Sequence, residues 1–338
     1  MGHERNRFMK KARLFGIVLI FILAAQPLHG GEQAALQQKK HSHKFTRIDT
    51  TFKSRGANCA AWLYLPWTVS KPPLVIMAHG FGAEKTFLLD EYAKRFVSER
   101  LACLVFDYRG FGDSQGEPRN YVNPRRHLED WQSAIAFARS LDSVDNKRIA
   151  LWGTSFSGGH VIVTASRDPE IAAIVAQVPF VDGRSSGRSF RYKLQALYHG
   201  LRDAIGAALF NKRHYVPIVA APDTFGMLNT PDALEGWKKS RPPGVSPDRK
   251  CPANIALTAF FYRPVKYASG VSCPALIIYA QQDTLIPAKD VKKTAEKIPL
   301  VTVIGLPIKH FDVYVGDVFE KTVKLEAEFL IRQLLPAS

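Results

Sequence analysis

The sequence predicts an α/β fold: a mostly parallel central sheet flanked by helices. One observation behind this prediction is that short, continuous apolar runs of strand length alternate with longer helical patterns. Such alternation is typical of parallel strands that are buried on both faces and joined by crossover helices. A second observation is a glycine-flanked serine between one apolar run and the next helical pattern. The predicted parallel strands lie at residues 74–78, 102–106, 148–152, 171–177, 275–280 and 301–306.

The first thirty residues differ in composition from the rest of the chain. Five arginines and lysines within residues 5–13 precede an apolar run at residues 14–25, and a polar stretch with small residues follows. Twelve apolar residues fall short of the ~20 that span a membrane, but they suit the core of a signal peptide. We expect residues 1–30 to be a signal peptide that directs export to the periplasm or the medium. An uncleaved signal anchor is the alternative.

The folded part is expected to begin with two β-rich stretches, residues 44–53 and 58–65, that form an antiparallel pair. The next apolar run, at residues 73–78, ends in His79-Gly80-Phe81-Gly82. A strand that ends in this pattern leaves a flat loop whose backbone N–H groups can face a developing oxyanion. The N–H of Phe81 is therefore predicted to be one donor of an oxyanion hole.

The segment Gly153-Thr154-Ser155-Phe156-Ser157-Gly158-Gly159 follows a short strand pattern and leads directly into a helical one. A serine at such a corner is held on a strained backbone with its hydroxyl exposed, and the close turn requires small neighbours. Ser155 is the predicted nucleophile, and the N–H of Phe156 is the predicted second oxyanion donor. Ser157 stands where the usual G-x-S-x-G pattern has its second glycine.

The acid and the base are expected after two later strands. Asp283 comes just past the strand at 275–280, and His310 follows the last strand. The chain order Ser155, Asp283, His310 is the one expected when these three side chains form a catalytic triad. Asp182, after the strand that follows the serine helix, is the competing acid.

Other histidines are weaker candidates for the base. One shares the serine's helix, one belongs to the oxyanion loop, and three fall in helical or inserted segments. They are His160, His79, His127, His199 and His214. The Asp107-Tyr108-Arg109 stretch directly follows the predicted strand at residues 102–106 and is interpreted as a structural turn.

Taken together, these motifs resemble the α/β-hydrolase superfamily. More narrowly, they resemble bacterial dienelactone-hydrolase-like serine hydrolases that border on the X-prolyl dipeptidyl peptidases. The resemblance covers the chain from about residue 44 to the C-terminus and implies a Ser-His-Asp hydrolase without a metal or organic cofactor. It does not fix the substrate, because this fold serves many functions. The matching segments are residues 79–82, 106–114, 153–159 and 310–314, together with Asp283 and Pro287.

Residues 183–272 interrupt the alternation of strands and helices. A compact sheet does not need so long a connection, so we expect an inserted helical lid over the active site, with residues 44–182 and 273–338 as the core. The lid carries 14 basic and five acidic residues, a net charge of +9 out of +16 for the chain. That charge favours anionic substrates or an anionic membrane or envelope surface, although solvated helix faces explain it equally well. No nucleic-acid-binding module is recognisable.

Four cysteines gain relevance if the protein is exported. Cys59 and Cys103 lie inside strand patterns and are expected to be buried thiols. Cys251 and Cys273 flank the end of the lid and are the more plausible disulfide pair in an oxidising compartment.

The leading functional hypothesis is hydrolysis of an acyl bond, most plausibly in a small carboxylic ester. A peptidase or amidase, a thioesterase, or an acyltransferase with the same triad are alternatives, and a catalytically silent binding protein is a more distant one. The lid aromatic residues are expected to shape an apolar acyl pocket. They are Phe190, Tyr192, Tyr215 and Phe225.

Overall fold

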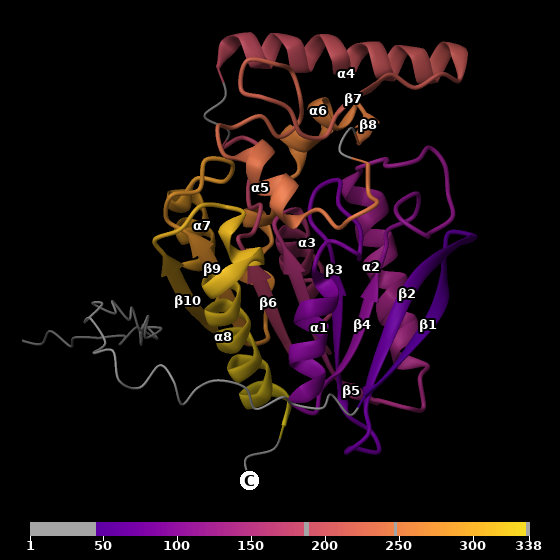
Figure 1. Ribbon diagram of the computed structural model, residues 1–338, viewed down its shortest axis with the longest axis vertical. Helices are drawn as coiled ribbons and strands as arrows, with labels where there is room; N and C mark the ends of the chain where they lie inside the picture. Colours follow the sequence, from indigo (N-terminus) through magenta and orange to yellow (C-terminus); the bar gives the residue numbers. More distant parts are fainter. Residues whose placement is uncertain (1–44, 186–188, 247–248, 336–338) are drawn as a thin grey trace, which may run out of the picture.

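The computed structural model describes residues 45–185, 189–246 and 249–335. Its main feature is an eight-stranded sheet with the order β1-β2-β4-β3-β5-β6-β9-β10 (Figure 1). The expected α/β architecture with a mostly parallel sheet is confirmed. The strands are β1 (Phe45–Ser54), β2 (Ala57–Pro66), β3 (Pro73–Ala78), β4 (Ala102–Phe106), β5 (Asp145–Thr154), β6 (Ala173–Gln177), β9 (Ala275–Ala280) and β10 (Val301–Leu306).

The strand directions divide the sheet into two parts. β1 pairs antiparallel with β2 along the whole hairpin, and β2 pairs antiparallel with β4. From β4 to β10 all pairings are parallel. The opening antiparallel pair and the six later strands are where the sequence predicted them, and every strand boundary lies within three residues of its predicted position. Because parallel strands end at one edge, the loops after β3, β5, β9 and β10 meet there.

Helices cover both faces of the sheet, and alternate residues of each buried strand contact opposite layers. In β3, Leu74 and Ile76 pack on the side of α2 (Pro124–Arg139) and α3 (Phe156–Ala165). Val75 and Met77 face the other layer, with α1 (Leu89–Ser98) and α8 (Gly316–Leu334). Each such fully buried side chain stabilises the fold by about 1.5–3 kcal/mol.

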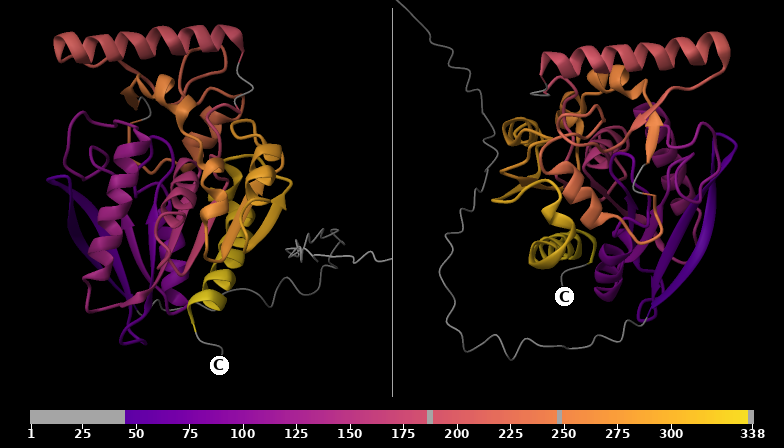
Figure 2. Two further views of the ribbon diagram at one scale, coloured as in Figure 1. Left: turned by 180° about the vertical axis from the view of Figure 1, so that it is seen from behind. Right: turned by 45° about the horizontal axis from the view of Figure 1, so that its top comes forward.

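The segment between β6 and β9 forms a separate layer above the carboxyl ends of the strands (Figures 1 and 2). It contains helices and a small antiparallel sheet, and the sequence did not predict the sheet. α4 lies across the top, above α6, β7 and β8. The elements are α4 (Phe190–Phe210), β7 (Tyr215–Pro217), α5 (Ala233–Ser240), β8 (Lys250–Pro252) and α6 (Ile255–Thr258), and α7 (Ala288–Ala295) follows after β9.

All four cysteines are free and buried, so the expected Cys251–Cys273 disulfide is wrong. Cys251 is held in β8 opposite Val216, within the lid, whereas Cys273 lies two residues before β9 of the main sheet. Burial raises the pKa of Cys273 to about 11 and that of Cys251 further.

The predicted signal peptide, residues 1–30, lies outside the described residues. Among the helices that the structure does describe, none combines the length and the apolar character required to cross a membrane.

Candidate active site

Ser155 lies at the corner between β5 and α3. Its backbone has φ 54° and ψ −116°, a strained conformation for a residue other than glycine. The corner closes because its neighbours are small: a side chain on Gly153 would collide with the carbonyl oxygen of Ser157. The sequence had indicated this geometry from the glycines alone.

A continuous hydrogen-bond chain links the three residues of the predicted triad. Nε2 of His310 lies 3.0 Å from Oγ of Ser155, and Nδ1 of His310 lies 2.7 Å from Oδ2 of Asp283. An ionised carboxylate can only accept, so Nδ1 carries the proton and Nε2 is left to accept one from Ser155. The other carboxylate oxygen, Oδ1 of Asp283, accepts the N–H groups of Leu285 and Ile286, both at 2.8 Å.

The competing acid, Asp182, has a different partner. Its two carboxylate oxygens accept hydrogen bonds of 2.8 and 2.7 Å from Nε and Nη2 of Arg263. Burial acts to raise the pKa of Asp182, but the hydrogen bonds and charges of Arg263 and Arg184 together outweigh burial and lower the pKa. Asp182 therefore joins the end of the core to the lid, and Asp283 is the carboxylate that contacts His310.

Ser157, which departs from the usual glycine pattern, is accommodated by a hydrogen bond inside the core. Its Oγ lies 2.8 Å from the hydroxyl of Tyr108, which also accepts the indole N–H of Trp131 at 2.9 Å. All three residues are fully buried. The hydroxyl of Ser157 is thus satisfied away from the nucleophile, a long-range contact that no local pattern indicated.

The loop after β3 runs directly against the nucleophile. A Cβ on Gly80 would lie 3.0 Å from Cβ of Ser155 and 3.3 Å from the carbonyl oxygen of Thr154, which is tighter than ordinary contact, so glycine suits this approach. The rings of Phe81 and Phe156 meet edge to face at 5.5 Å between centroids. The backbones of both predicted oxyanion donors are therefore adjacent to Ser155.

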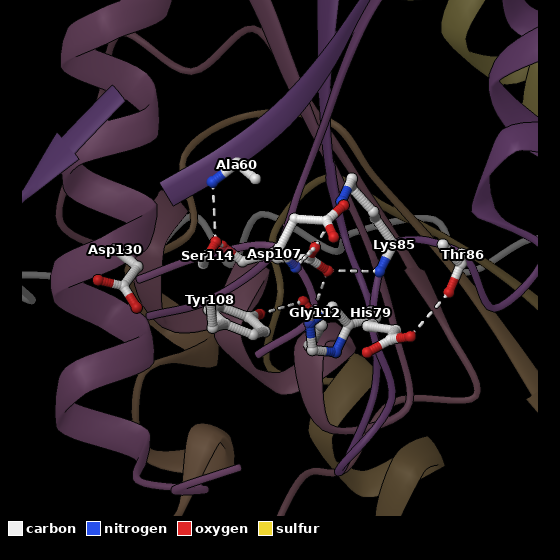
Figure 3. A network of polar contacts seen from close by, with 12 residues as sticks. Ala60, His79, Lys85, Thr86, Asp107, Tyr108, Gly112, Ser114 and Asp130 are labelled. Atoms are coloured by element: carbon white, nitrogen blue, oxygen red, sulfur yellow. Dashed lines mark hydrogen bonds and ion pairs between the residues drawn. The ribbon is translucent and has the colours of Figure 1, made fainter. Parts of the chain in front are cut away.

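A network of ion pairs and hydrogen bonds connects Lys85, in the loop after β3, to Asp107 and Asp113 (Figure 3). Nζ of Lys85 lies 2.7 Å from Oδ2 of Asp107 and also bonds to Asp113, while the backbone N–H of Lys85 donates to Oδ1 of Asp107 at 2.6 Å. Gly112 leaves room for Asp107, because a Cβ there would collide with the carboxylate. Ser114 connects the carbonyl of Asp107 to the N–H of Ala60 in β2. The Asp107 stretch is structural, as expected, but sequence reasoning missed the role of Lys85.

Burial and the neighbouring charges together shift the pKa values of the groups in this network. It raises the pKa of Asp107 to about 6, a rise that Lys85 limits. Burial acts to lower the pKa of Lys85, yet Asp107 and Asp113 outweigh it and raise the pKa. Burial also lowers the pKa of His79 to about 3, so this ring is neutral. Its Nε2 lies 3.8 Å from Asp107 and has no hydrogen-bond partner among the described residues.

The buried rings of His127, His160 and Tyr262 pack against Phe156. Nδ1 of His127 lies 3.2 Å from Nε2 of His160, and Nδ1 of His160 lies 2.6 Å from the hydroxyl of Tyr262. Burial lowers the pKa of His160 to about 3 and that of His127 well below its ordinary value. These histidines are neutral packing residues and do not contact Ser155.

A cavity of about 510 Å³ opens beside Ser155 between the core and the lid. Of the four aromatic residues expected to shape it, only Tyr192 lines it. Phe190 and Tyr215 are exposed, and Phe225 packs on His199 and Tyr192. The other lining side chains are mostly apolar, with two cations among them. The lining includes Phe81, Phe156, Phe180, Arg184, Lys193, Ala196, Leu197, Met227, Leu228, Leu257, Phe260, Phe261, Leu285 and Ile286.

Within the described residues, no three His, Cys, Asp or Glu side chains gather so that they could hold a metal ion. A family model described as the alpha/beta hydrolase fold matches residues 73–316. The chain belongs to the alpha/beta hydrolase family. The match spans the oxyanion loop, the serine corner, the lid and His310. The match identifies the superfamily, but it does not identify the narrower dienelactone-hydrolase or dipeptidyl-peptidase branch.

Proteins similar to this chain are named for several different activities. The chain is 39% identical over 289 residues to the quorum-quenching protein AidA of Acinetobacter baumannii, covering 84% of this chain and 94% of that protein. It is 26% identical to the thiohydrolase aneE of Aspergillus aculeatus, covering 76% and 85% of the two chains. The crystal structure of GrgF from Penicillium sp. matches with a TM-score of 0.73 at 24% identity, over 86% of this chain and 99% of that one. That structural likeness shows the fold alone.

Proposed function

We propose that this protein is a serine hydrolase that cleaves a carboxylic ester through Ser155, His310 and Asp283. The observation that carries the proposal is the unbroken hydrogen-bond chain from Oγ of Ser155 through both ring nitrogens of His310 to the carboxylate of Asp283. A nucleophile, a base and an orienting acid within hydrogen-bond reach are what acyl transfer by a serine requires.

In the proposed mechanism, Nε2 of His310 takes the proton of Ser155 as Oγ attacks the ester carbonyl. The N–H groups of Phe81 and Phe156 stabilise the oxyanion, an effect worth about 10²–10³ in turnover for each donor. Protonated His310 then gives its proton to the departing alkoxide, which leaves as the alcohol. A water molecule, deprotonated by His310, attacks the acyl-enzyme, and Ser155 regains its proton as the carboxylic acid leaves.

The lining of the cavity supports an apolar acyl chain as the substrate group. Its walls are largely aliphatic and aromatic, and they begin at Ser155 itself. Arg184 and Lys193 add positive charge to the wall, which favours an acyl group with an anionic or strongly polar end. The similarity to a protein named as quorum-quenching supports a small signal molecule as the substrate class.

Thioester hydrolysis is the second candidate, and it is favoured by the similarity to a protein named as a thiohydrolase. The same triad attacks a thioester with a thiol as the leaving group. The peptidase alternative, and with it the X-prolyl dipeptidyl peptidase-like branch, is less well supported. The lid carries five acidic residues against 14 basic ones, whereas an acidic subsite is needed to hold a substrate amino terminus.

An activity panel tests the proposal. Purified full-length protein is assayed with p-nitrophenyl esters of graded chain length, an acyl lactone, an acyl thioester and aminoacyl p-nitroanilides. Ester cleavage that Ser155→Ala abolishes and Ser157→Ala retains would support the esterase. The control removes a neighbouring serine hydroxyl that faces Tyr108 and not His310.

Other outcomes of the panel would change the assignment. Cleavage of the thioester alone would replace the ester with a thioester, and cleavage of the anilides alone would favour the peptidase. Silence on every substrate, with no labelling of Ser155 by a fluorophosphonate, would contradict hydrolysis altogether and favour a binding protein.

We also propose that residues 1–30 direct export, with a retained signal anchor as the alternative. Cell fractionation combined with the N-terminal sequence of the mature protein tests this. An unprocessed protein in the cytoplasm would contradict both forms of the proposal.

A further inference from the structure

The longest helix of the lid, α4, presents an unusual surface. A helix at the surface of a protein ordinarily buries its apolar stripe and exposes its polar side. In α4 the arrangement is reversed, because the large apolar side chains face outward. The exposed ones are Phe190, Leu194, Leu197, Tyr198, Leu201, Ile205, Leu209 and Phe210. Most recur at spacings of three and four residues, so they share one face of the helix.

The inner face of α4 is fixed by small and polar contacts. Ala196, Gly200 and Asp203 are its buried residues. A side chain on Gly200 would collide with Leu257 of α6, so the two helices pack closely. Asp203 accepts the backbone N–H groups of His214 and Asn254 at 2.8 and 2.9 Å. The helix is therefore anchored to the lid by its inner face, and the outer apolar face is not needed for that attachment (Figures 1 and 2).

The charged side chains that α4 itself exposes are all positive. Arg191, Lys193 and Arg202 are exposed beside the apolar stripe, and Lys212 follows the end of the helix. Asp203, the one acidic residue of α4, is buried on the inner face. A helix with a broad apolar face flanked by arginine and lysine is the type that lies in the plane of a lipid interface. A second copy of this face would bring the exposed cations of α4 together, with Asp223 beside Arg191 as the nearby exposed acid.

We propose that the outer face of α4 docks this protein onto an anionic lipid surface. The apolar stripe enters the boundary between headgroups and acyl chains, and the flanking cations contact lipid phosphates. Leu197 and Phe261 belong both to the exposed surface and to the wall of the cavity beside Ser155. Docking therefore turns the cavity toward the lipid, so that apolar acyl substrates can enter from it; this last step rests on the proposed function.

A site-specific fluorescent label tests the docking. Ile205→Cys, on the outer face of α4, and Leu300→Cys, an exposed control, each receive a polarity-sensitive dye on the full-length protein. Leu300 directly precedes β10, at the opposite end of the parallel strands from the lid. The four native cysteines are all buried, so the introduced thiol is the one that reacts.

With phosphatidylglycerol vesicles the dye at position 205 is expected to brighten severalfold, and the dye at position 300 is expected to stay unchanged. Phosphatidylcholine vesicles are expected to give a much smaller response. No response at position 205, or equal responses at both positions, would overturn the proposal. Because every variant carries the same N-terminal residues, the difference between the two labels reports on α4 alone.

The charge requirement has its own variant and control. Arg191→Gln combined with Arg202→Gln in the labelled protein is expected to weaken vesicle binding about tenfold or more, given about 1 kcal/mol for each cation near an anionic surface. Lys321→Gln combined with Arg332→Gln, an equal loss of charge on exposed positions of α8, should change binding less than about twofold. Equal effects of the two pairs would contradict docking through α4.

Two further readouts separate this proposal from its neighbours. Ser155→Ala should bind vesicles as the parent protein does. A parent protein that binds vesicles but hydrolyses no substrate would contradict the proposed hydrolysis and leave the docking proposal standing. Sedimentation without lipid tests the second-copy alternative. A dimer that Ile205→Arg dissociates would assign this face to self-association and overturn docking to lipid.

Discussion

The core beneath Ser155 and the lid above it hold their polar and apolar groups in opposite ways. Beneath the serine, charged groups such as Lys85 and Asp107 are buried and paired with each other. On the lid, α4 exposes leucine and isoleucine side chains and surrounds them with cations. The core holds the backbone and side chains around Oγ of Ser155 at fixed positions. The apolar side chains on the outer face of α4 remain exposed in the folded protein, so we expect them to contribute little to its stability.

The sharpest contrast between the two regions lies in their acids. Asp283→Asn is expected to lower kcat for the substrate found in the panel by about 10⁴, because an amide no longer holds His310 in the required tautomer. Asp182→Asn should lower kcat only a few-fold, since its partner is Arg263. Steady-state kinetics of both variants, with circular dichroism to check folding, decides the matter. Similar losses in the two variants would break the assignment of Asp283.

The cations should differ next, and in stability more than in activity. Lys85→Met removes one partner of a buried ion pair and is expected to lower the free energy of unfolding by about 3–5 kcal/mol. Lys212→Met, on the exposed lid, should change it by less than about 0.5 kcal/mol. Denaturant unfolding of both variants measures this, and a Lys85→Met protein as stable as the parent would refute the supporting role of the network.

The histidines predict a pH dependence of stability. His160 titrates with a pKa of about 3 when folded and near 6.5 when unfolded, so the unfolded chain binds more protons below pH 6.5. Stability is therefore expected to fall as pH falls, by about 1 kcal/mol for each such histidine between pH ~6.5 and ~5.5 and by about 1.4 kcal/mol for each further pH unit down to pH ~4. His160→Gln should flatten this slope. His214→Gln, half-buried in the lid, should flatten it less, and a reversed order would contradict the difference in burial.

The smallest expected effect concerns the outer face of α4. Leu201→Ala should change the free energy of unfolding by less than about 0.5 kcal/mol, because this side chain is 45% exposed. Leu104→Ala, in the centre of β4, is expected to cost about 2–5 kcal/mol, because it leaves a cavity in the core. Thermal and denaturant unfolding of the pair measure the difference. A large loss for Leu201→Ala would mean that the apolar stripe of α4 serves folding.

Much of the fold followed from the sequence because its signals are local. Strands buried on both faces read as continuous apolar runs, so β4, β9 and β10 were predicted at their observed positions. The triad residues stand directly after strand ends, and in a parallel sheet those ends meet at one edge. Chain order and strand position therefore predicted that Ser155 and His310 lie close together, and their side chains are 3.0 Å apart in the structure.

What the sequence did not indicate depends on contacts between distant segments. Lys85 reads as an ordinary loop lysine, and only the approach of Asp107 from the next strand buries it. Ser157 looked like a defect in the glycine pattern until Tyr108 supplied a partner. The disulfide prediction failed for the same reason, because proximity in a schematic order does not place Cys251 and Cys273 in the same layer.

The lid leaves the sheet at β6 and returns at β9, and these two strands are direct neighbours in parallel register, with Ile174 opposite Ala275. The excursion therefore takes the place of a single crossover connection. The length of the insertion has only a weak effect on the stability of the sheet, because the entropic cost of closing a loop grows slowly with its length. Such an insertion behaves as a module: we expect its length and sequence to tolerate change without loss of the sheet that carries Ser155.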